Sequence, residues 1–259
     1  VTPGATILHV MKHHEPLYSH PFFTLYNGDV LTCLQTLHDD SVDAVITDPP
    51  YCNGISLSAR RVDPAEKYQK SGTVKSYPPM LGDGKDQRSF LTWATMWMSE
   101  CWRIAKYGAP MLVFTDWRQL PLMSDAIQAA GWFWQGIVCW NKRSSRPQMG
   151  KFRHQCEYVL FASKGRFSPF SKACLPGVYE YPIIAQQKLH LTSKPVALVK
   201  DLLAIAPEGC TVLDPFVGGG TTAVAALETG RKCVAVELSK EYARLTMERA
   251  KRCLPETPA

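Results

Sequence analysis

Four consecutive residues, Asp48-Pro49-Pro50-Tyr51, combine groups that could activate the exocyclic amine of adenine or cytosine. Such an amine is a poor nucleophile because its lone pair is delocalised into the ring. If the Asp48 carboxylate and the Pro49 carbonyl each accept one N–H, the nitrogen can pyramidalise toward a methyl donor, and the developing charge is stabilised. The Tyr51 ring is a candidate for stacking on an extruded base. Taken alone, the same residues could be a turn that ends a strand.

A glycine-rich segment near the end of the chain is typical of a cofactor-binding loop. Its three glycines remove side chains where a strand turns into a helix, so that a cofactor can approach the backbone. Glu237 ends the next expected strand, where an acidic side chain can bind ribose hydroxyls. The candidate residues are Asp214, Phe216, Gly218, Gly219, Gly220, Thr221, Thr222 and Glu237.

The same loop also matches Gly-x-Gly-x-x-Ala, so an NAD-dependent dehydrogenase is a competing hypothesis. That hypothesis gives Asp48 and Tyr51 no function. Two more positions are candidates for the cofactor site. Asp29 could accept a hydrogen bond from the adenine amine of a cofactor, and Lys194, followed by Pro195, could pair with a cofactor carboxylate. The alternative for Asp29 is a plain turn, and the alternative for Lys194 is a capped helix start; either would show a similar sequence.

The elements that must position these residues alternate along the chain. From Phe22 onward, apolar or β-branched runs alternate with stretches of helical period, which predicts βαβ units and a mostly parallel sheet. The chain therefore reads as one α/β domain over residues 1–259. Expected strands are 22–26, 42–47, 111–114, 133–140, 157–162, 212–213 and 233–237, and expected helices are 31–37, 90–105, 121–130, 194–205, 221–228 and 240–252.

Three stretches rich in Gly, Pro, Ser or basic residues interrupt this rhythm, at 52–89, 141–154 and 164–190. Loops of such length in a compact domain are usually functional or disordered. We interpret the first as a flap and the second as a loop that faces DNA, where cations would neutralise phosphates. A solvated loop is the alternative. The candidate DNA-binding residues are Arg60, Arg61, Lys142, Arg143, Arg146, Lys151 and Arg153.

The composition excludes several other classes. A net charge of +6 is compatible with a polyanionic partner but is weak evidence for one. The nine cysteines include no Cys-x-x-Cys pair, and the histidines lack ligand spacing, so we expect reduced thiols and no metal. No apolar run approaches the roughly 20 residues of a membrane span, and no charged-then-apolar leader opens the chain, so we expect a cytoplasmic protein.

The ordered set of these motifs resembles the β group of DNA amino-methyltransferases, in which the catalytic tetrapeptide precedes the cofactor loop. The resemblance covers about residues 25–252. It implies a Rossmann-like, mostly parallel seven-stranded sheet with one reversed strand and a circularly permuted motif order. It further implies S-adenosylmethionine as cofactor, with contacts at Asp29, Asp48, Lys194, Pro195, Asp214, Phe216, Gly218, Gly219, Gly220, Thr221, Thr222 and Glu237.

Within that family an Asp at the first tetrapeptide position favours adenine N6, and Ser favours cytosine N4. The resemblance therefore predicts methylation of a flipped-out adenine in double-stranded DNA, as in restriction–modification systems, with cytosine N4 as the alternative and a homodimer as the expected assembly. A methyltransferase without activity that only binds DNA is a third hypothesis, against which the intact tetrapeptide argues. Gly219 and Leu191 depart from the family pattern, and the target-recognition region is reduced to 164–190.

Overall fold

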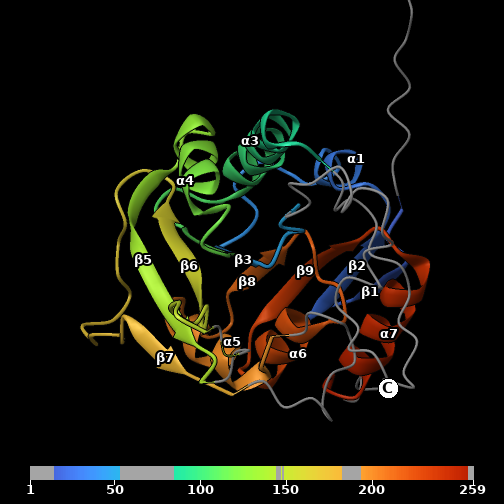
Figure 1. Ribbon diagram of the computed structural model, residues 1–259. Coiled ribbons are helices and arrows are strands. Elements are labelled where there is room, and N and C mark those ends of the chain that lie inside the picture. Colours follow the sequence, from blue (N-terminus) through green and yellow to red (C-terminus); the bar gives the residue numbers. More distant parts are fainter. Residues whose placement is uncertain (1–14, 53–84, 144–146, 148, 183–193, 256–259) are drawn as a thin grey trace, which may run out of the picture.

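A nine-stranded sheet organises the chain (Figure 1). The computed structural model describes residues 15–52, 85–143, 147, 149–182 and 194–255. In space the strands follow the order β1-β2-β9-β8-β3-β4-β6-β5-β7. Their bounds are β1 Tyr18–His20, β2 Phe23–Asn27, β3 Ala44–Thr47, β4 Pro110–Thr115, β5 Phe133–Asn141, β6 Cys156–Ser163, β7 Val178–Glu180, β8 Thr211–Asp214 and β9 Lys232–Glu237.

The seven central strands have the expected arrangement. Strands β2, β9, β8, β3 and β4 are parallel, and β6 runs in the reverse direction between β4 and β5. The two strands that the sequence did not predict lie at the edges. β1 pairs antiparallel with β2, and β7 pairs parallel with β5. Each has three residues, too few to show an alternating pattern.

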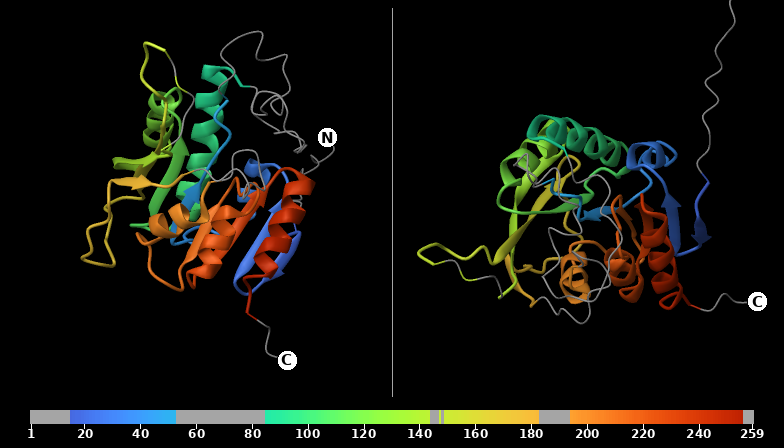
Figure 2. Two further views of the ribbon diagram at one scale, coloured as in Figure 1. Left: turned by 60° about the horizontal axis from the view of Figure 1, so that its bottom comes forward. Right: turned by 45° about the vertical axis from the view of Figure 1, so that its right-hand side comes forward.

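Helices cover both faces of the sheet (Figures 1 and 2). Helices α1, α3 and α4 pack on one face around Trp97 and Met111, and α5, α6 and α7 pack on the other around Leu112 and Leu203. Because both faces are covered, every residue of β3 and β4 is buried. The helices are α1 Val30–Leu34, α3 Gln87–Ile104, α4 Leu120–Ala129, α5 Val196–Leu203, α6 Thr221–Glu228 and α7 Lys240–Lys251.

The predicted loops are partly replaced by regular structure. Residues 87–89, expected in the flap, form the start of α3. Asp86 is its N-cap, and the Asp86 carboxylate accepts hydrogen bonds from the Arg88 and Ser89 amides. The remainder of the expected flap, from residue 53 to 84, lies outside the described residues. The stretch 164–190 contains β7. In the part of the chain that the structure describes, no helix is both long and apolar enough to cross a membrane.

Candidate active site

The candidate catalytic and cofactor residues meet at one edge of the sheet. Parallel strands end at a common edge, and ligands in open α/β sheets bind there. Asn27 of β2 pairs in register with Glu237 of β9, and Asp214 of β8 pairs with Ala235 of β9. β3 lies beside β8 and ends at Thr47, directly before Asp48. The structure therefore brings together motifs that lie far apart in the sequence.

Both oxygens of the Asp48 carboxylate are occupied. The Tyr51 hydroxyl donates to Oδ1 over 2.7 Å, and the Lys194 ammonium donates to Oδ2 over 2.6 Å. Lys194 precedes α5 and extends across the site, with its Nζ 5.2 Å from the centroid of the Tyr51 ring. Only 6% of the Lys194 side chain is exposed, compared with 24% of Asp48. The expected catalytic residues therefore form one hydrogen-bonded cluster with Lys194.

A residue that sequence reasoning missed, Glu157, completes this cluster. Its Oε2 accepts from the Tyr51 hydroxyl and pairs with Lys194 Nζ, each over 3.2 Å. Its Oε1 accepts from Lys142 Nζ over 3.0 Å. Glu157 is the second residue of β6, and the reversed direction of that strand brings it to the carboxyl edge. A lone acidic residue at the head of an apolar strand is the signal that could have revealed it, since buried carboxylates are almost always paired.

The cluster alternates positive and negative charges. Burial alone would raise the pKa of Glu157, but the charges of Lys194 and Lys142 outweigh it and lower that pKa. Burial would likewise lower the pKa of Lys194, yet the Asp48 and Glu157 carboxylates raise it. Burial raises the pKa of Asp48 against the opposing effect of Lys194. Burial and the nearby Asp48 carboxylate raise the pKa of Tyr51 well above its usual value, so its hydroxyl stays a donor.

The glycine loop joins β8 to α6 in a conformation that only glycine adopts easily. Gly218 and Gly220 have φ angles of 52° and 83°, and Gly220 is the N-cap of α6. A Cβ at Gly220 would lie 3.0 Å from Oγ1 of Thr246 on α7. That hydroxyl donates to the Gly218 carbonyl over 2.7 Å. Helix α7 therefore packs closely against the loop and supports its shape.

The acidic residues around the loop have different surroundings. Asp214 is buried and accepts from Thr47 Oγ1 over 2.7 Å and from the Phe216 amide over 3.0 Å, so it ties the loop to β3. Burial raises its pKa to about 6. Glu237 accepts from the Gly218 amide over 2.9 Å and from the Ser239 amide over 2.8 Å. Burial raises the pKa of Glu237 to about 7.

The other expected cofactor residues lie around the same edge. Asp29 caps α1 and accepts from the Leu31 amide over 3.0 Å. The Phe216 ring packs on Trp93 and Trp97, with centroid distances of 5.4 and 5.1 Å. The remaining members occupy the loop, the start of α6 and the N-cap of α5, and these are Gly219, Thr221, Thr222 and Pro195.

The basic residues proposed to contact DNA fall into four groups. Lys142 is paired with Glu157 inside the site, and its side chain is only 16% exposed. Arg143 forms an ion pair with Glu180 of β7. Lys151 and Arg153 are exposed in the connection between β5 and β6. Arg60, Arg61 and Arg146 lie outside the described residues.

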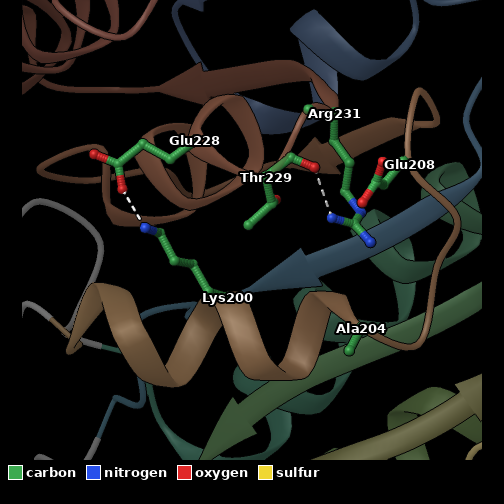
Figure 3. Close-up of a pocket in the computed structure, with 7 residues that line it drawn as sticks. Lys200, Ala204, Glu208, Glu228, Thr229 and Arg231 are labelled. Atoms are coloured by element: carbon green, nitrogen blue, oxygen red, sulfur yellow. Dashed lines mark hydrogen bonds and ion pairs between the residues drawn. The ribbon is translucent and has the colours of Figure 1, made fainter.

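A surface hollow of about 360 Å³ lies away from this cluster (Figure 3). It sits between α5 and α6, next to the residues that precede β8 and β9, and therefore at the opposite edge of the sheet. Lys200 and Glu228 pair across it over 2.6 Å. Because no residue of the carboxyl-edge cluster lines it, the hollow is not the site described above. Its lining residues are Lys200, Ala204, Glu208, Glu228, Thr229, Gly230 and Arg231.

Comparison with known sequences identifies a family. A family model described as DNA methylase matches residues 42–182 and 171–248. A protein of Escherichia coli (strain K12) named as a methylase, YubD, is 30% identical over 224 residues, which cover 86% of this chain and 87% of that protein. The DNA adenine methyltransferase YhdJ of the same organism is 24% identical, covering 87% of this chain and 82% of its own.

Solved structures agree in fold. The PvuII DNA methyltransferase, named as cytosine-N4-specific, has a TM-score of 0.69 at 17% identity, with 95% of this chain and 91% of that chain covered. A complex of M1.HpyAVI with S-adenosylmethionine has a TM-score of 0.61 at 22% identity, covering 88% and 99%. At these identities the similarity shows a shared fold.

Proposed function

The chain belongs to the DNA methylase family, and from this membership we propose that it transfers a methyl group from S-adenosylmethionine to N6 of adenine in duplex DNA. The observation that carries the proposal is Asp48, held at the carboxyl end of β3 beside Tyr51 and next to the strand that leads into the glycine loop. Asp at this position favours adenine in similar enzymes. Cytosine N4 is the second candidate, because the PvuII enzyme of like fold is named as specific for it.

The glycine loop and its neighbours fit the cofactor. Gly218 and Gly220 leave backbone without side chains at the start of α6, and the Glu237 carboxylate lies beside them, so that hydroxyl donors of a ribose would find an acceptor. Asp29 and Phe216 would flank the adenine. S-adenosylmethionine, when bound, supplies a methyl group on a positively charged sulfur. The Phe216 ring packs against Trp93 and Trp97, and these contacts hold it in the position where it would contact the cofactor.

Asp48 must release at least one of its two donors before it can accept an N–H from a target amine. Glu157 provides an alternative acceptor for both, because its Oε2 already lies 3.2 Å from the Tyr51 hydroxyl and from Lys194 Nζ. We propose that Lys194 and Tyr51 shift toward Glu157 when the base enters. Lys142 holds the other oxygen of Glu157 in place. Asp48 then orients the amine, and its carboxylate accepts the proton that the amine loses on methylation.

Two earlier assignments change in this proposal. Lys194, expected to bind a cofactor carboxylate, acts on Asp48 instead, since it is enclosed between Asp48 and Glu157. Lys142, expected to bind phosphate, positions Glu157. The exposed Lys151 and Arg153 remain the proposed phosphate contacts among the described cations, together with Arg143 if DNA displaces Glu180.

Product analysis tests the proposed function. The protein is incubated with labelled S-adenosylmethionine and unmethylated DNA, and the DNA is digested to nucleosides. Labelled N6-methyladenine is the expected product. Labelled N4-methylcytosine would show that cytosine N4 is the target in place of adenine N6. If neither labelled nucleoside appeared, the proposal would be refuted. Sequencing of the modified DNA would then identify the recognition site.

A further inference from the structure

Two large apolar side chains stand fully in solvent on the connection between β5 and β6. We name residues 142–155 the basic arm. Met149 is 98% exposed and Phe152 is 95% exposed. The described residues 149–155 of the arm extend away from the body of the molecule (Figure 2). Two apolar side chains at such exposure within four residues offer apolar surface that a partner could cover.

The charge of the arm identifies the chemistry of that partner. Residues 142–155 contain five cations, namely Lys142, Arg143, Arg146, Lys151 and Arg153, and no Asp or Glu. Lys151 and Arg153 flank Phe152 directly, and both are exposed. An apolar ring between two exposed cations matches a polyanion that also offers flat aromatic surfaces. Stacked bases between phosphates have both properties.

The base of the arm is tied to the catalytic segment. The His154 ring stacks on Trp117, with centroids 5.0 Å apart and planes at 15°. Trp117 lies in the turn after β4, where the Asp116 carboxylate accepts from the Gln119 amide over 3.1 Å. The Gln119 side chain donates to the carbonyl of Cys52, the neighbour of Tyr51, over 3.4 Å. The arm therefore leaves the protein beside the catalytic tetrapeptide.

We propose that Phe152 and Met149 insert between base pairs next to the target and occupy the space that the flipped base vacates, while Lys151 and Arg153 hold the adjoining phosphates. The inference rests on the proposed function, because it takes duplex DNA as the partner. Apolar side chains inserted at base steps unstack the duplex, and this lowers the cost of extruding a base. The arm thus helps to open the duplex, and Asp48 acts on the base that leaves it.

Permanganate oxidation of unstacked thymines tests this insertion without requiring methyl transfer. The full chain is bound at saturating concentration to unmethylated plasmid DNA in the presence of S-adenosylhomocysteine, and reactive thymines are mapped by sequencing. The wild-type protein should create discrete reactive thymines. The double variant Phe152→Ala, Met149→Ala should still bind DNA but lower this reactivity about tenfold, because the inserted side chains are gone. Phe152→Leu should keep most of it, since leucine is also an effective wedge.

The matched control is the double variant Phe133→Ala, Met96→Ala, which removes an exposed Phe and an exposed Met far from the arm, at 63% and 50% exposure. It should behave as wild type. Equal reactivity of the wild-type protein and the arm variant on bound DNA would overturn the inference, as would bound DNA with no reactive thymine at all. Loss of binding to phosphatidylserine vesicles in the arm variant, with unchanged DNA reactivity, would assign the arm to a membrane and also overturn it. A protein that creates reactive thymines but transfers no methyl group would refute the proposed function alone.

Discussion

Replacing Glu157 by Gln tests the central charge cluster, because it removes one negative charge and keeps the shape of the side chain. Glu157 pairs with Lys194 Nζ at 3.2 Å and with Lys142 Nζ at 3.0 Å. At an effective dielectric constant near 20, each attraction amounts to about 5 kcal/mol before the desolvation of the groups is subtracted. Breaking a buried pair by removing one partner typically costs about 3–5 kcal/mol. Lys194 keeps Asp48 as a partner, so we expect the lower end, about 3 kcal/mol of unfolding free energy.

Turnover per folded molecule should also fall, which a loss of stability alone would not cause. Without the Glu157 charge, Lys194 and the Tyr51 hydroxyl stay on Asp48 and compete with the target amine. We expect kcat to fall about 100-fold, equivalent to about 2.7 kcal/mol of transition-state stabilisation. The affinity for S-adenosylmethionine should change little. Urea unfolding, single-turnover methyl transfer and calorimetric cofactor titration measure the three quantities on one preparation.

Glu180→Gln is the matched control. Glu180 lies on the edge strand β7, and the substitution removes its acidic charge from an exposed ion pair with Arg143. It should leave stability and turnover near the wild-type values. Glu157→Asp should recover part of the lost turnover, since it restores the charge at a slightly greater distance. A Glu157→Gln protein that is folded and turns over normally, or one that loses cofactor affinity and keeps kcat, would show that Glu157 does not relieve Asp48 of its donors.

Two further predictions concern the cofactor loop. Burial raises the pKa of Glu237 from 4.5 to about 7, so the folded protein binds more protons than the unfolded chain between these values; its unfolding free energy should therefore fall by about 3 kcal/mol as the pH rises through that window. Glu237→Gln should remove its share of this slope in urea unfolding and leave the share of Asp214, whose pKa is also raised, to about 6. An unchanged slope above that value, up to the Glu237 pKa of about 7, would exclude Glu237 as a source. Gly220→Ala should lower the unfolding free energy by about 2–3 kcal/mol, because it combines an unfavourable positive φ with a Cβ 3.0 Å from Thr246, whereas Gly230→Ala, at φ 69° with open space, should cost only about 1 kcal/mol. Equal melting temperatures for the two alanine variants would contradict the packing argument.

The sequence predicted the parts of the site that depend on local pattern. The segment before Asp48 is an apolar strand stopped by prolines, and the segment before Gly218 is a strand that turns into a helix, so their placement at one sheet edge follows from parallel topology. Glu157 could not be assigned in this way. Its position depends on β6 running antiparallel to β4, and the residues of a strand do not reveal the direction in which the strand runs.

The basic loop shows the same limit. Lys142 and Lys151 look alike in sequence, yet Lys142 directly follows β5 beside β6 and its ammonium pairs with the Glu157 carboxylate, whereas Lys151 lies farther out. Strands β1 and β7 escaped prediction because three residues carry no period. The roles of Arg60, Arg61 and Arg146, the cytoplasmic location and the homodimer remain predictions.

Asp48→Ala tests the central claim most directly when methyl transfer and cofactor binding are measured on the same preparation. The substitution removes the carboxylate that orients the amine and leaves the glycine loop and Glu237 intact. We predict that labelled methyl transfer to DNA falls to background while S-adenosylmethionine still binds with an affinity close to that of the wild-type protein. Transfer at a rate near that of the wild-type protein would contradict the assignment of Asp48 as the group on which the reaction depends.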